Sequence, residues 1–261
     1  MNSQIDWASQ GVALKTLSFR EINRFTRIWS QTLLPPVIQM SLYFLIFGKF
    51  IGSQIRMVEG FTYIQYIVPG LAMMSIMTNA YSNTASSFFL TKFNRSIEEM
   101  LVSPMSNVIT LLGFMLGGTI RGLLVGSLVI IVSSLFTHLT IHHFGIIIAM
   151  AVLAAMVFSL GGLINGIYAK HFDDIAFIPT FVLTPLTYLG GVFYSINQLP
   201  TTWQTVSMFN PIFEIVDTFR YGMLGISDLN IYFGFALILT LFIGLFIWAW
   251  ILLEKGIGIK V

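Results

Sequence analysis

Long apolar runs, nearly free of charged residues, constrain this chain more than any other feature. A helix needs about 20 apolar residues to cross the hydrocarbon core of a bilayer. Six runs come close to or exceed that length, at residues 32–52, 62–90, 118–136, 144–168, 175–194 and 231–252. Only 9% of the residues are charged, whereas soluble domains carry roughly 25%. We therefore predict an all-α polytopic membrane protein with six transmembrane helices, forming one transmembrane domain over residues 1–261.

Two of these boundaries depend on where an apolar stretch is divided. Pro69-Gly70 interrupts the second run, and residues 107–136 are too long for one untilted span. We expect residues 107–117 to approach along the interface and the third span to start near Gly118. Arg121 would then lie near the cytoplasmic end of the span and extend to the headgroups. If the span starts earlier, Arg121 lies deep and becomes a functional candidate.

Residues 12–29 precede the first run and have the pattern of an amphipathic elbow helix. Its expected apolar face consists of Leu14, Leu17, Ile22, Phe25 and Trp29. Its expected polar face carries Thr16, Arg20, Asn23, Arg24 and Arg27, whereas Phe19 and Glu21 break the pattern. A basic helix of this kind lies in the plane of the lipid headgroups.

Residues 92–105 form the longest charged island between two apolar runs. At helical spacing, one face carries Phe93, Ile97, Met100 and Leu101, and the other carries Arg95, Glu98 and Glu99. Arg95 is placed to pair with either carboxylate, and Pro104 cannot continue the helix. Two interpretations stay open at this point: a solvated loop with one helical turn, or a helix that another protein binds.

The segment 195–229, between the last two runs, is too apolar for a loop in water. Asn210-Pro211 has the signature of a helix start and Gly225 that of a helix end. We expect two short helices here that re-enter the outer leaflet. Most lysine and arginine residues fall on the opposite side of the membrane from this segment, and they include Lys15, Lys92 and Lys170. The positive-inside rule then places both termini in the cytoplasm.

Motifs for chemistry are missing from the chain. It has no cysteine, no phosphate-binding loop and no hydrolase motif, so we expect no catalytic residue, cofactor or metal in this chain. His138, His142 and His143 cluster in one turn, where we favour a headgroup-level location over a metal site. A net charge of +2 gives no field for nucleic acid. The spans hold few ionisable residues, which disfavours an ion-coupled secondary transporter and favours energy from a partner.

Four motifs carry a resemblance to a known family: VPGL (68–71), EEMLVSPMS (98–106), GGVFYSINQLP (190–200) and NPIFEIVDTFRYGMLG (210–225). Over nearly its whole length the chain resembles the type-2 family of ABC export permeases, and it looks most like the small bacterial YadH-type inner-membrane permeases. The resemblance implies the membrane subunit of an ATP-driven exporter in the bacterial inner membrane. A pathway with so few charges suits an apolar or amphipathic cargo such as a lipid, glycolipid or drug, and polysaccharide is the alternative that the family adds.

The resemblance also implies partners and sites. The partners are two copies of an ABC ATP-binding subunit, which carries the ATP and Mg, a second permease protomer expected to be a copy of this chain, and membrane lipid. Residues 93–104 would be a coupling helix in a cleft of the ATPase, using Phe93, Arg95, Ile97, Glu98, Glu99, Met100, Leu101 and Pro104. An outer gate and dimer region would contain Gly190, Gly191, Phe193, Tyr194, Pro200, Asn210, Pro211, Asp217 and Arg220. We expect Asp217 and Arg220 to form a structural pair rather than to bind substrate.

Overall fold

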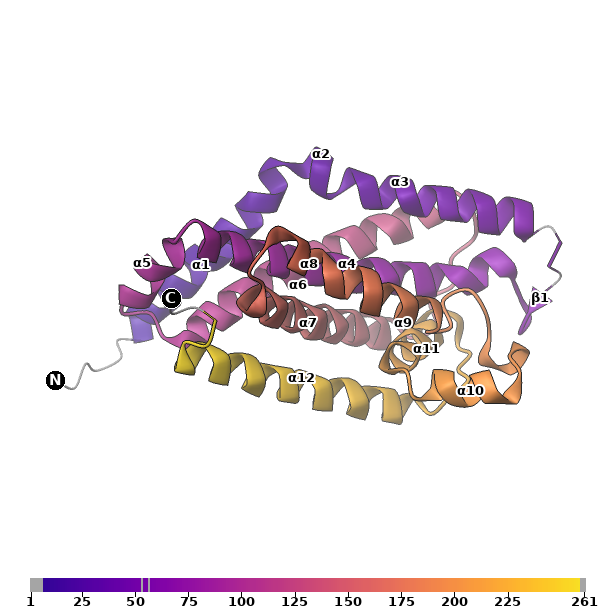
Figure 1. The fold of residues 1–261 in the computed structure, drawn as a ribbon. Helices are drawn as coiled ribbons and strands as arrows, with labels where there is room; N and C mark the ends of the chain where they lie inside the picture. The colour runs from indigo at the N-terminus through magenta and orange to yellow at the C-terminus, as the bar shows by residue number, and fades with distance from the viewer. Residues whose placement is uncertain (1–6, 53, 56, 259–261) are drawn as a thin grey trace.

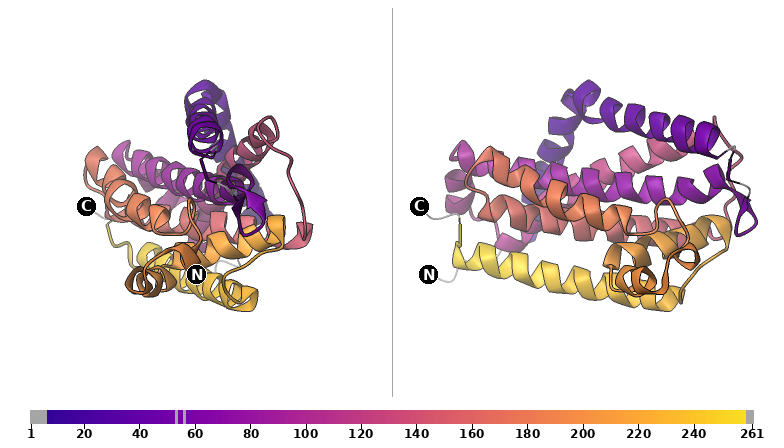
Figure 2. Two further views of the ribbon diagram at one scale, coloured as in Figure 1. Left: turned by 90° about the vertical axis from the view of Figure 1, so that its right-hand side faces the viewer. Right: turned by 45° about the vertical axis from the view of Figure 1, so that its right-hand side comes forward.

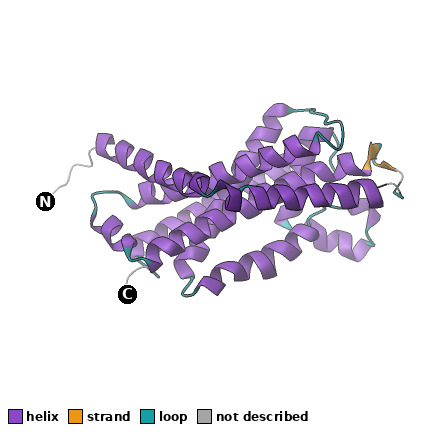
Figure 3. Cartoon of the chain, turned by 90° about the horizontal axis from the view of Figure 1, so that it is seen from above, coloured by secondary structure: helices purple, strands orange, loops and turns teal. Residues whose placement is uncertain are grey.

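The computed structural model describes residues 7–258 apart from Ser53 and Arg56, and it leaves out the side chains of Lys49 and Leu101. Its helices are α1 (Trp7–Arg27), α2 (Trp29–Thr32), α3 (Leu34–Tyr43), α4 (Tyr63–Phe93), α5 (Ser96–Val102), α6 (Asn107–Ser133), α7 (Phe144–Tyr168), α8 (Phe172–Ile178), α9 (Thr184–Tyr188), α10 (Thr201–Met208), α11 (Pro211–Leu224) and α12 (Ile231–Lys255). The π-helical segments η1 (Phe44–Ile51) and η2 (Pro179–Leu183) continue α3 and α8, and η3 (Ile196–Gln198) is a single 3-10 turn. β1 (Met57–Val58) and β2 (Phe61–Thr62) form a small antiparallel hairpin, the strands visible in Figure 3.

Helix α4 is the centre of the bundle and packs most extensively against α7 and α6. The segment α2–α3 and helix α12 lie on opposite sides of this central layer (Figure 2). The helices around α4 keep large apolar side chains exposed, as expected where lipid replaces protein as the neighbour. The core therefore lies along α4, and the flanking helices offer apolar faces to their surroundings.

Glycine allows α4 to lie close to its two main neighbours. A side chain at Gly118 of α6 would overlap the hydroxyls of Thr84 and Ser159. A side chain at Gly162 of α7 would overlap the carbonyl oxygen of Tyr81 in α4. Small residues at helix interfaces permit this close approach of backbones, which drives association of helices inside membranes.

The all-α class is confirmed, and four helices among the described residues are long and apolar enough to cross a membrane. These are Trp29–Gly48, Asn107–Ser133, Phe144–Tyr168 and Ile231–Lys255. The expected second span corresponds to α4, and the expected fifth span overlaps α8, η2 and α9. The polar residues of α4 lower its hydropathy, but they are largely buried inside the protein. A count of six spans stays a prediction.

Two helices are continuous where we expected a division. Helix α4 continues through Pro69-Gly70, because a proline removes one hydrogen bond while packed neighbours support the rest of the helix. Helix α6 continues from Asn107 to Ser133 with no break at Gly118. Gly118 is a packing residue inside the helix and does not mark its start.

Both described chain ends lie at the same end of the bundle. The beginning of α1, the end of α12 and the whole of α5 gather there, and we call this the termini end (Figure 1). The β-hairpin, α10 and α11 lie at the opposite end, which we call the hairpin end. The structure thus separates the expected coupling segment from the expected outer segment by the full length of the bundle. Lys260, which the positive-inside rule would count on the cytoplasmic side, and Arg56, which it would count on the outer side, lie outside the described residues.

Candidate functional site

The charged island is not the single helix 93–104 that we expected. Phe93 is the last residue of α4, and Arg95 then has a left-handed backbone conformation with φ of 60° before α5 begins. A non-glycine residue in that conformation breaks a right-handed helix. Arg95 therefore lies outside α5, and in the described part of the chain it forms no ion pair with Glu98 or Glu99.

The apolar face of α5 points into the chain. Ile97 is buried in a core cluster, and Met100 packs against the same cluster, so neither forms the outward surface that we expected. Glu98 and Glu99 are exposed in the first turn, where the helix dipole favours carboxylates. Val102 is 87% exposed. Two carboxylates and one valine are the outward side chains that the structure describes on α5.

Three further residues expected at this surface lie beside or within α5. Phe93 is 61% exposed, and its ring centroid lies 5.1 Å from that of Phe172 at the start of α8. Pro104 is exposed in the turn that follows α5. Leu101 belongs to α5, but the structure does not describe its side chain. The two phenylalanines add apolar surface next to the carboxylates of α5.

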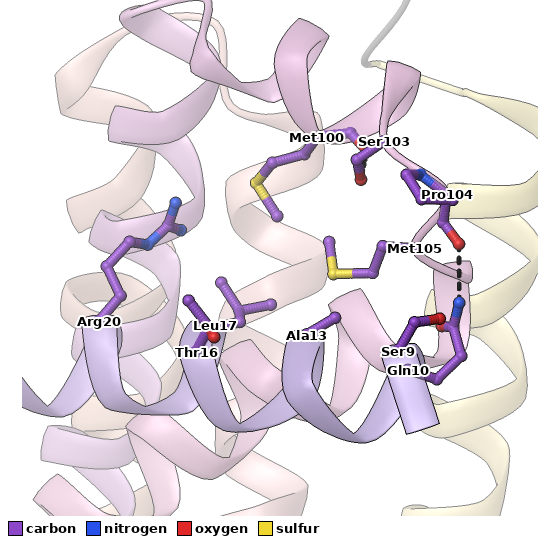
Figure 4. A pocket seen from close by; sticks show the side chains of 10 residues that line it. All are labelled: Ser9, Gln10, Ala13, Thr16, Leu17, Arg20, Met100, Ser103, Pro104 and Met105. Atoms are coloured by element: carbon purple, nitrogen blue, oxygen red, sulfur yellow. Dashed lines mark hydrogen bonds between the residues drawn. The ribbon is translucent and has the colours of Figure 1, made fainter. Parts of the chain in front are cut away.

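A groove of about 310 Å³ separates α1 from α5 and its following turn (Figure 4). Its lining residues are Ser9, Gln10, Ala13, Thr16, Leu17, Arg20, Met100, Ser103, Pro104 and Met105. Gln10 crosses one end: its Nε2 donates to the carbonyl of Pro104 at 2.7 Å, and its Oε1 accepts from the amide of Ser106 at 3.0 Å. Met100 and Met105 point into the space between the two elements. One glutamine therefore fixes the turn after α5 to α1.

Lys92 ties the last turn of α4 to the end of α7. Its Nζ donates to the carbonyls of Ile167 at 2.7 Å and Ala169 at 2.6 Å, which the end of a helix leaves without partners. Burial lowers the pKa of Lys92, and the nearby carboxylate of Asp174 opposes that shift. The base of α5 is thereby connected to two long helices of the bundle.

The expected polar face of α1 is turned partly into the protein. Glu21, whose side chain is 1% exposed, accepts a hydrogen bond from Ser87 and pairs with Arg20 at 3.2 Å and Arg24 at 3.4 Å. Arg24 also donates to the backbone and side-chain oxygens of Asn83 at 3.1 and 2.7 Å. Burial lowers the pKa of Arg24, while Glu21 raises it. A buried charge needs such partners, so Glu21 belongs to the packed face.

The rest of α1 also differs from the expected faces. The helix begins at Trp7, earlier than residue 12, and its buried residues are Gln10, Leu17, Glu21 and Phe25. Arg27 is exposed, as expected for the polar face. Trp29, expected on the apolar face, is 60% exposed and begins α2.

Arg121 extends into the bundle, so the expected outward extension to the headgroups is wrong. Its guanidinium lies 3.4 Å from Asn83 Oδ1, 3.3 Å from the carbonyl of Thr32 and 3.5 Å from Asn79 Oδ1. The reason is that α6 starts at Asn107, which places Arg121 in the middle of the helix beside amide oxygens of α4. The open alternative, an arginine deep within the bundle, describes its location.

At the hairpin end, α11 begins and ends where the sequence predicts. Asn210 precedes the helix; its Oδ1 accepts from the amide of Ile212 at 3.0 Å, and its Nδ2 donates to the carbonyl of Leu186 at 2.6 Å. Pro211 is the first helical residue, where its missing N–H has no consequence. Gly225 closes the helix with φ of 76°, a conformation that favours glycine. Asn210 thus joins α11 to α9.

Asp217 and Arg220 do form a pair, as expected from their spacing. Arg220 Nη1 lies 3.8 Å from Asp217 Oδ1, and both side chains are buried. Arg220 also donates to the carbonyl of Gly191, and its guanidinium lies 4.1 Å above the ring of Tyr66. Ion pairing, a hydrogen bond and a cation–π contact together stabilise this buried arginine. These contacts join α11, α4 and the loop that follows α9.

The remaining residues expected in the outer region belong to the segment between α9 and α10. Gly190 and Gly191 lie against Ile212 and Phe213 of α11, and Gly191 has φ of 68°. The carbonyl of Phe193 accepts from Tyr63 at 3.0 Å, and that of Tyr194 accepts from Tyr66 at 3.3 Å. Pro200 precedes α10.

The histidine turn offers no metal centre within the described part of the chain, where no group of three or more potential ligands is found. The rings of His142 and His143 pack against each other and against Tyr221 of α11. Their backbone amides donate to the carbonyl of Gly222 at 3.0 and 2.8 Å. These contacts anchor the turn between α6 and α7 to α11.

Comparison with known proteins decides the family. A family model described as "ABC-2 type transporter" matches residues 12–224. The chain belongs to the ABC-2 type transporter family. This ABC-2 permease is similar to the inner membrane transport permease YadH of Escherichia coli strain K12, with 51% identity over 249 residues that cover 95% of this chain and 97% of that protein. It is also similar to Nodulation protein J of Rhizobium leguminosarum bv. viciae, with 26% identity over 193 residues, or 73% of this chain and 74% of that protein.

Membership of this family confirms the resemblance inferred from the four motifs. An ABC-2 permease is the membrane component of an ABC transporter and associates with an ABC ATP-binding subunit. The similarity to an inner membrane permease also supports an inner-membrane location.

Sequence reasoning missed several residues that build the termini end. Gln10, Glu21 and Lys92 make long-range hydrogen bonds, and Val102 and Phe172 add exposed apolar surface at this end. One signal was available for two of them: Gln10, Leu17 and Glu21 are spaced by seven and four residues, which places them on one helical face.

Proposed function

We propose that this permease is the membrane-spanning subunit of an exporter that moves an apolar or amphipathic cargo across the inner membrane. In this proposal the chain spans the membrane six times, with α4 and the segment α8–η2–α9 as the additional spans. The termini end faces the cytoplasm, and α1 lies along the inner headgroups. A separate ATP-binding subunit, loaded with ATP and Mg, binds there in two copies.

The single observation that carries the proposal is how α5 is held. Its outward face presents Glu98, Glu99 and Val102 with no described partner in this chain. Its inward face is attached to the bundle through Ile97, and the turn after it is fixed by Gln10. A partner that moves α5 would therefore move α4 and α1 with it. This is what transmission of ATP-driven motion requires.

The surface of α5 defines the chemistry of the expected contact. The two carboxylates suit basic side chains or free backbone N–H groups of the ATPase. Val102, Phe93 and Phe172 suit apolar side chains around them. The groove between α1 and α5 adds room for an apolar side chain from the partner, and the turn 170–174 would add a smaller contact.

We infer the cargo class from the side chains that this chain would place along a transport pathway. The long helices carry few ionisable side chains, and Arg121 in the middle of α6 has polar partners within the bundle. An aromatic cluster joins α3, η1 and the end of α9: Tyr43 and Phe47 lie near Phe193, and the hydroxyls of Tyr43 and Tyr188 are 3.5 Å apart. Rings with hydroxyls suit an amphipathic cargo with a hydroxylated head, such as a glycolipid.

A second permease protomer, a copy of this chain, would complete the pathway. Helices α3 and α8 are among the least buried elements, and their exposed side chains include Ile38, Leu42 and Phe177. The aromatic cluster includes Tyr43 at the end of α3 and Tyr188 at the end of α9, which follows α8 and η2. We therefore expect the cargo route to run between protomers, with the outer loop and α11 at its far end.

The test is ATP turnover by the purified complex of this chain with its ATP-binding subunit. Reversing both charges, Glu98→Lys with Glu99→Lys, should abolish co-purification or lower permease-dependent turnover by at least tenfold, because cations would face a surface built for anions. Asp173→Lys, an exposed carboxylate in the turn 170–174, serves as a graded control with a smaller effect. Unchanged assembly and turnover in the double variant would refute the assignment of α5.

Cargo movement distinguishes an ABC exporter from an ion-coupled transporter. Vesicles that contain the complex should accumulate a fluorescent lipid or glycolipid only when ATP is supplied. Flux in ATP-free vesicles, driven by a proton gradient, would instead support the secondary transporter.

A further inference from the structure

Two carboxylates from distant parts of the sequence meet at the hairpin end. Glu59 lies in the turn between β1 and β2, and Asp228 lies between α11 and α12. Both lie next to Ser195, in the loop after α9, whose Oγ is 2.7 Å from Glu59 Oε1 and 3.4 Å from Asp228 Oδ1. Asn197 Nδ2 lies 3.0 Å from Asp228 Oδ1 and 3.4 Å from Glu59 Oε1. Three separate segments thus meet around two acids.

The hydrogen bonds at this meeting point cannot all form at once without another proton. The serine hydroxyl has one hydrogen, so it donates either to Glu59 or to Asp228 and not to both. The shorter distance shows that Glu59 receives it. When both acids are charged, Ser195 offers Asp228 only lone pairs, and the second acid repels it. A proton on Asp228 turns that repulsive contact into an O–H donor facing Ser195 Oγ.

The charged groups around Asp228 also favour its protonated form. Asp217 accepts from Ser227 Oγ at 2.6 Å and from the Asp228 amide at 3.0 Å, and it pairs with Arg220. Burial, together with the charges of Glu59 and Asp217, raises the pKa of Asp228 to about 6, whereas Arg220 and the backbone amide of Ile196 oppose the shift. Asp228 therefore gains a proton near neutral pH, whereas an ordinary aspartate does so near pH 4.

We propose that Glu59, Ser195 and Asp228 form a proton-dependent clamp that joins the β-hairpin, the loop after α9 and the α11–α12 connection. With one proton on Asp228 the three segments are joined by a continuous chain of hydrogen bonds. Without it the bond between Ser195 and Asp228 is lost, and Asn197 is left as the donor to the two acids. The repulsion between the two charged acids then lets the hairpin separate more readily from the other two segments. The same loop accepts hydrogen bonds from Tyr63, Tyr66 and Arg220, so the clamp acts on backbone that α4 and α11 already contact.

The sign of the pH dependence follows from the raised pKa. The closed clamp binds a proton more tightly than the open one, so its extra stability is complete below pH 4 and is lost as the pH rises through about 6. From pH 5 to pH 7 the equilibrium constant for opening should rise by up to about tenfold, less if solvent screens the partly exposed pair. The clamp lies on the side that we propose to be outer, so it would respond to the pH outside the cell.

The experiment is hydrogen exchange by mass spectrometry on the whole permease in lipid nanodiscs at pH 5, 6, 7 and 8. Exchange rates are divided by the intrinsic rate at each pH. In the wild type, segments 57–62 and 191–198 should open more as the pH rises. Asp228→Asn carries a permanent N–H donor at the same position, so it should keep these segments closed at every pH. Asp228→Ala should leave them open at every pH.

The controls separate a local switch from a general effect of charge. Asp173→Asn removes an exposed carboxylate at the termini end and should keep the wild-type response. Glu59→Gln removes the repelling charge and should move the midpoint of opening to lower pH. The proposal is overturned if the wild type shows no pH response in these segments, or if Asp228→Asn responds as the wild type does. Neither outcome depends on the direction of transport or on the ATPase, so failure here leaves the proposed function intact.

Discussion

Replacing Gly162 of α7 by alanine should weaken the largest helix contact of the bundle. An added Cβ would overlap the Tyr81 carbonyl oxygen of α4 and would lie 3.0 Å from the Tyr81 carbonyl carbon and 3.2 Å from the Ala85 amide nitrogen. All three atoms are backbone, so no side-chain rotation relieves the overlap, and the two helices must move apart. Overpacking costs about 1–3 kcal/mol, and we expect the upper end here because backbone atoms are involved.

Gly161 provides a matched control one residue earlier. A Cβ at Gly161 would lie 3.5 Å from the ring of Tyr81, an ordinary van der Waals distance. Both changes gain the same helix propensity on replacing glycine by alanine, so their difference isolates the packing against α4. A difference of about 3 kcal/mol corresponds to roughly 6–12 °C in Tm for a chain of this size.

The assay is thermal unfolding of the purified permease in detergent, followed by tryptophan fluorescence, for the wild type and both variants. We expect Gly162→Ala to unfold well below the other two. Because α4 leads directly into α5, the same variant should also lower permease-dependent ATP turnover. Equal melting temperatures for Gly161→Ala and Gly162→Ala would show that α4 and α7 are not in the close contact described here.

Two further predictions concern the termini end. Gln10→Ala removes both hydrogen bonds that fix the turn after α5. Hydrogen exchange of the amides in that turn should therefore rise several-fold, and ATP turnover should fall while the ATPase still binds. Unchanged exchange would contradict the role of Gln10. Backbone N–H donors of His171 and Lys170 lower the pKa of Asp174, so its contribution is present above about pH 4 and is lost as the pH falls through the lowered value. Asp174→Asn should therefore speed exchange in the turn 170–174 at pH 7 and match the wild type well below pH 4; a difference that persists in acid would argue against this.

Helix boundaries were most predictable where a local signal fixes them. The predicted span 144–168 has the same bounds as α7, and Asn210-Pro211 with Gly225 bounds α11. Capping and backbone conformation depend on a few neighbouring residues, so the sequence reports them directly. Pro69-Gly70 and Gly118 were less informative, because their effect depends on what packs beside them.

The faces of the helices were harder to predict, as α1 and α5 show. In water an apolar stripe indicates the buried side of a helix, but in a membrane protein an apolar side chain is equally stable against lipid and against protein. For α5, outside the spans, the apolar stripe suits either the bundle or a partner protein, so Ile97 and Met100 gave no indication that they pack inward. Glu21 stood out only as a break in the pattern of α1, because periodicity records polarity and not the partners that make a buried charge acceptable.

By itself, the sequence determined the class of this protein, the main apolar spans, the family and the local starts and ends of its helices, because each depends on composition or on a few adjacent residues. Only the tertiary structure decided that Arg95 separates α5 from α4, that Gln10 and Lys92 tie the termini end together, and that Glu59 meets Asp228 across the hairpin end. The contacts of Gln10, Lys92 and the two acids join residues far apart in the chain, and they form only when the helices approach closely enough to bring the partners within hydrogen-bond distance.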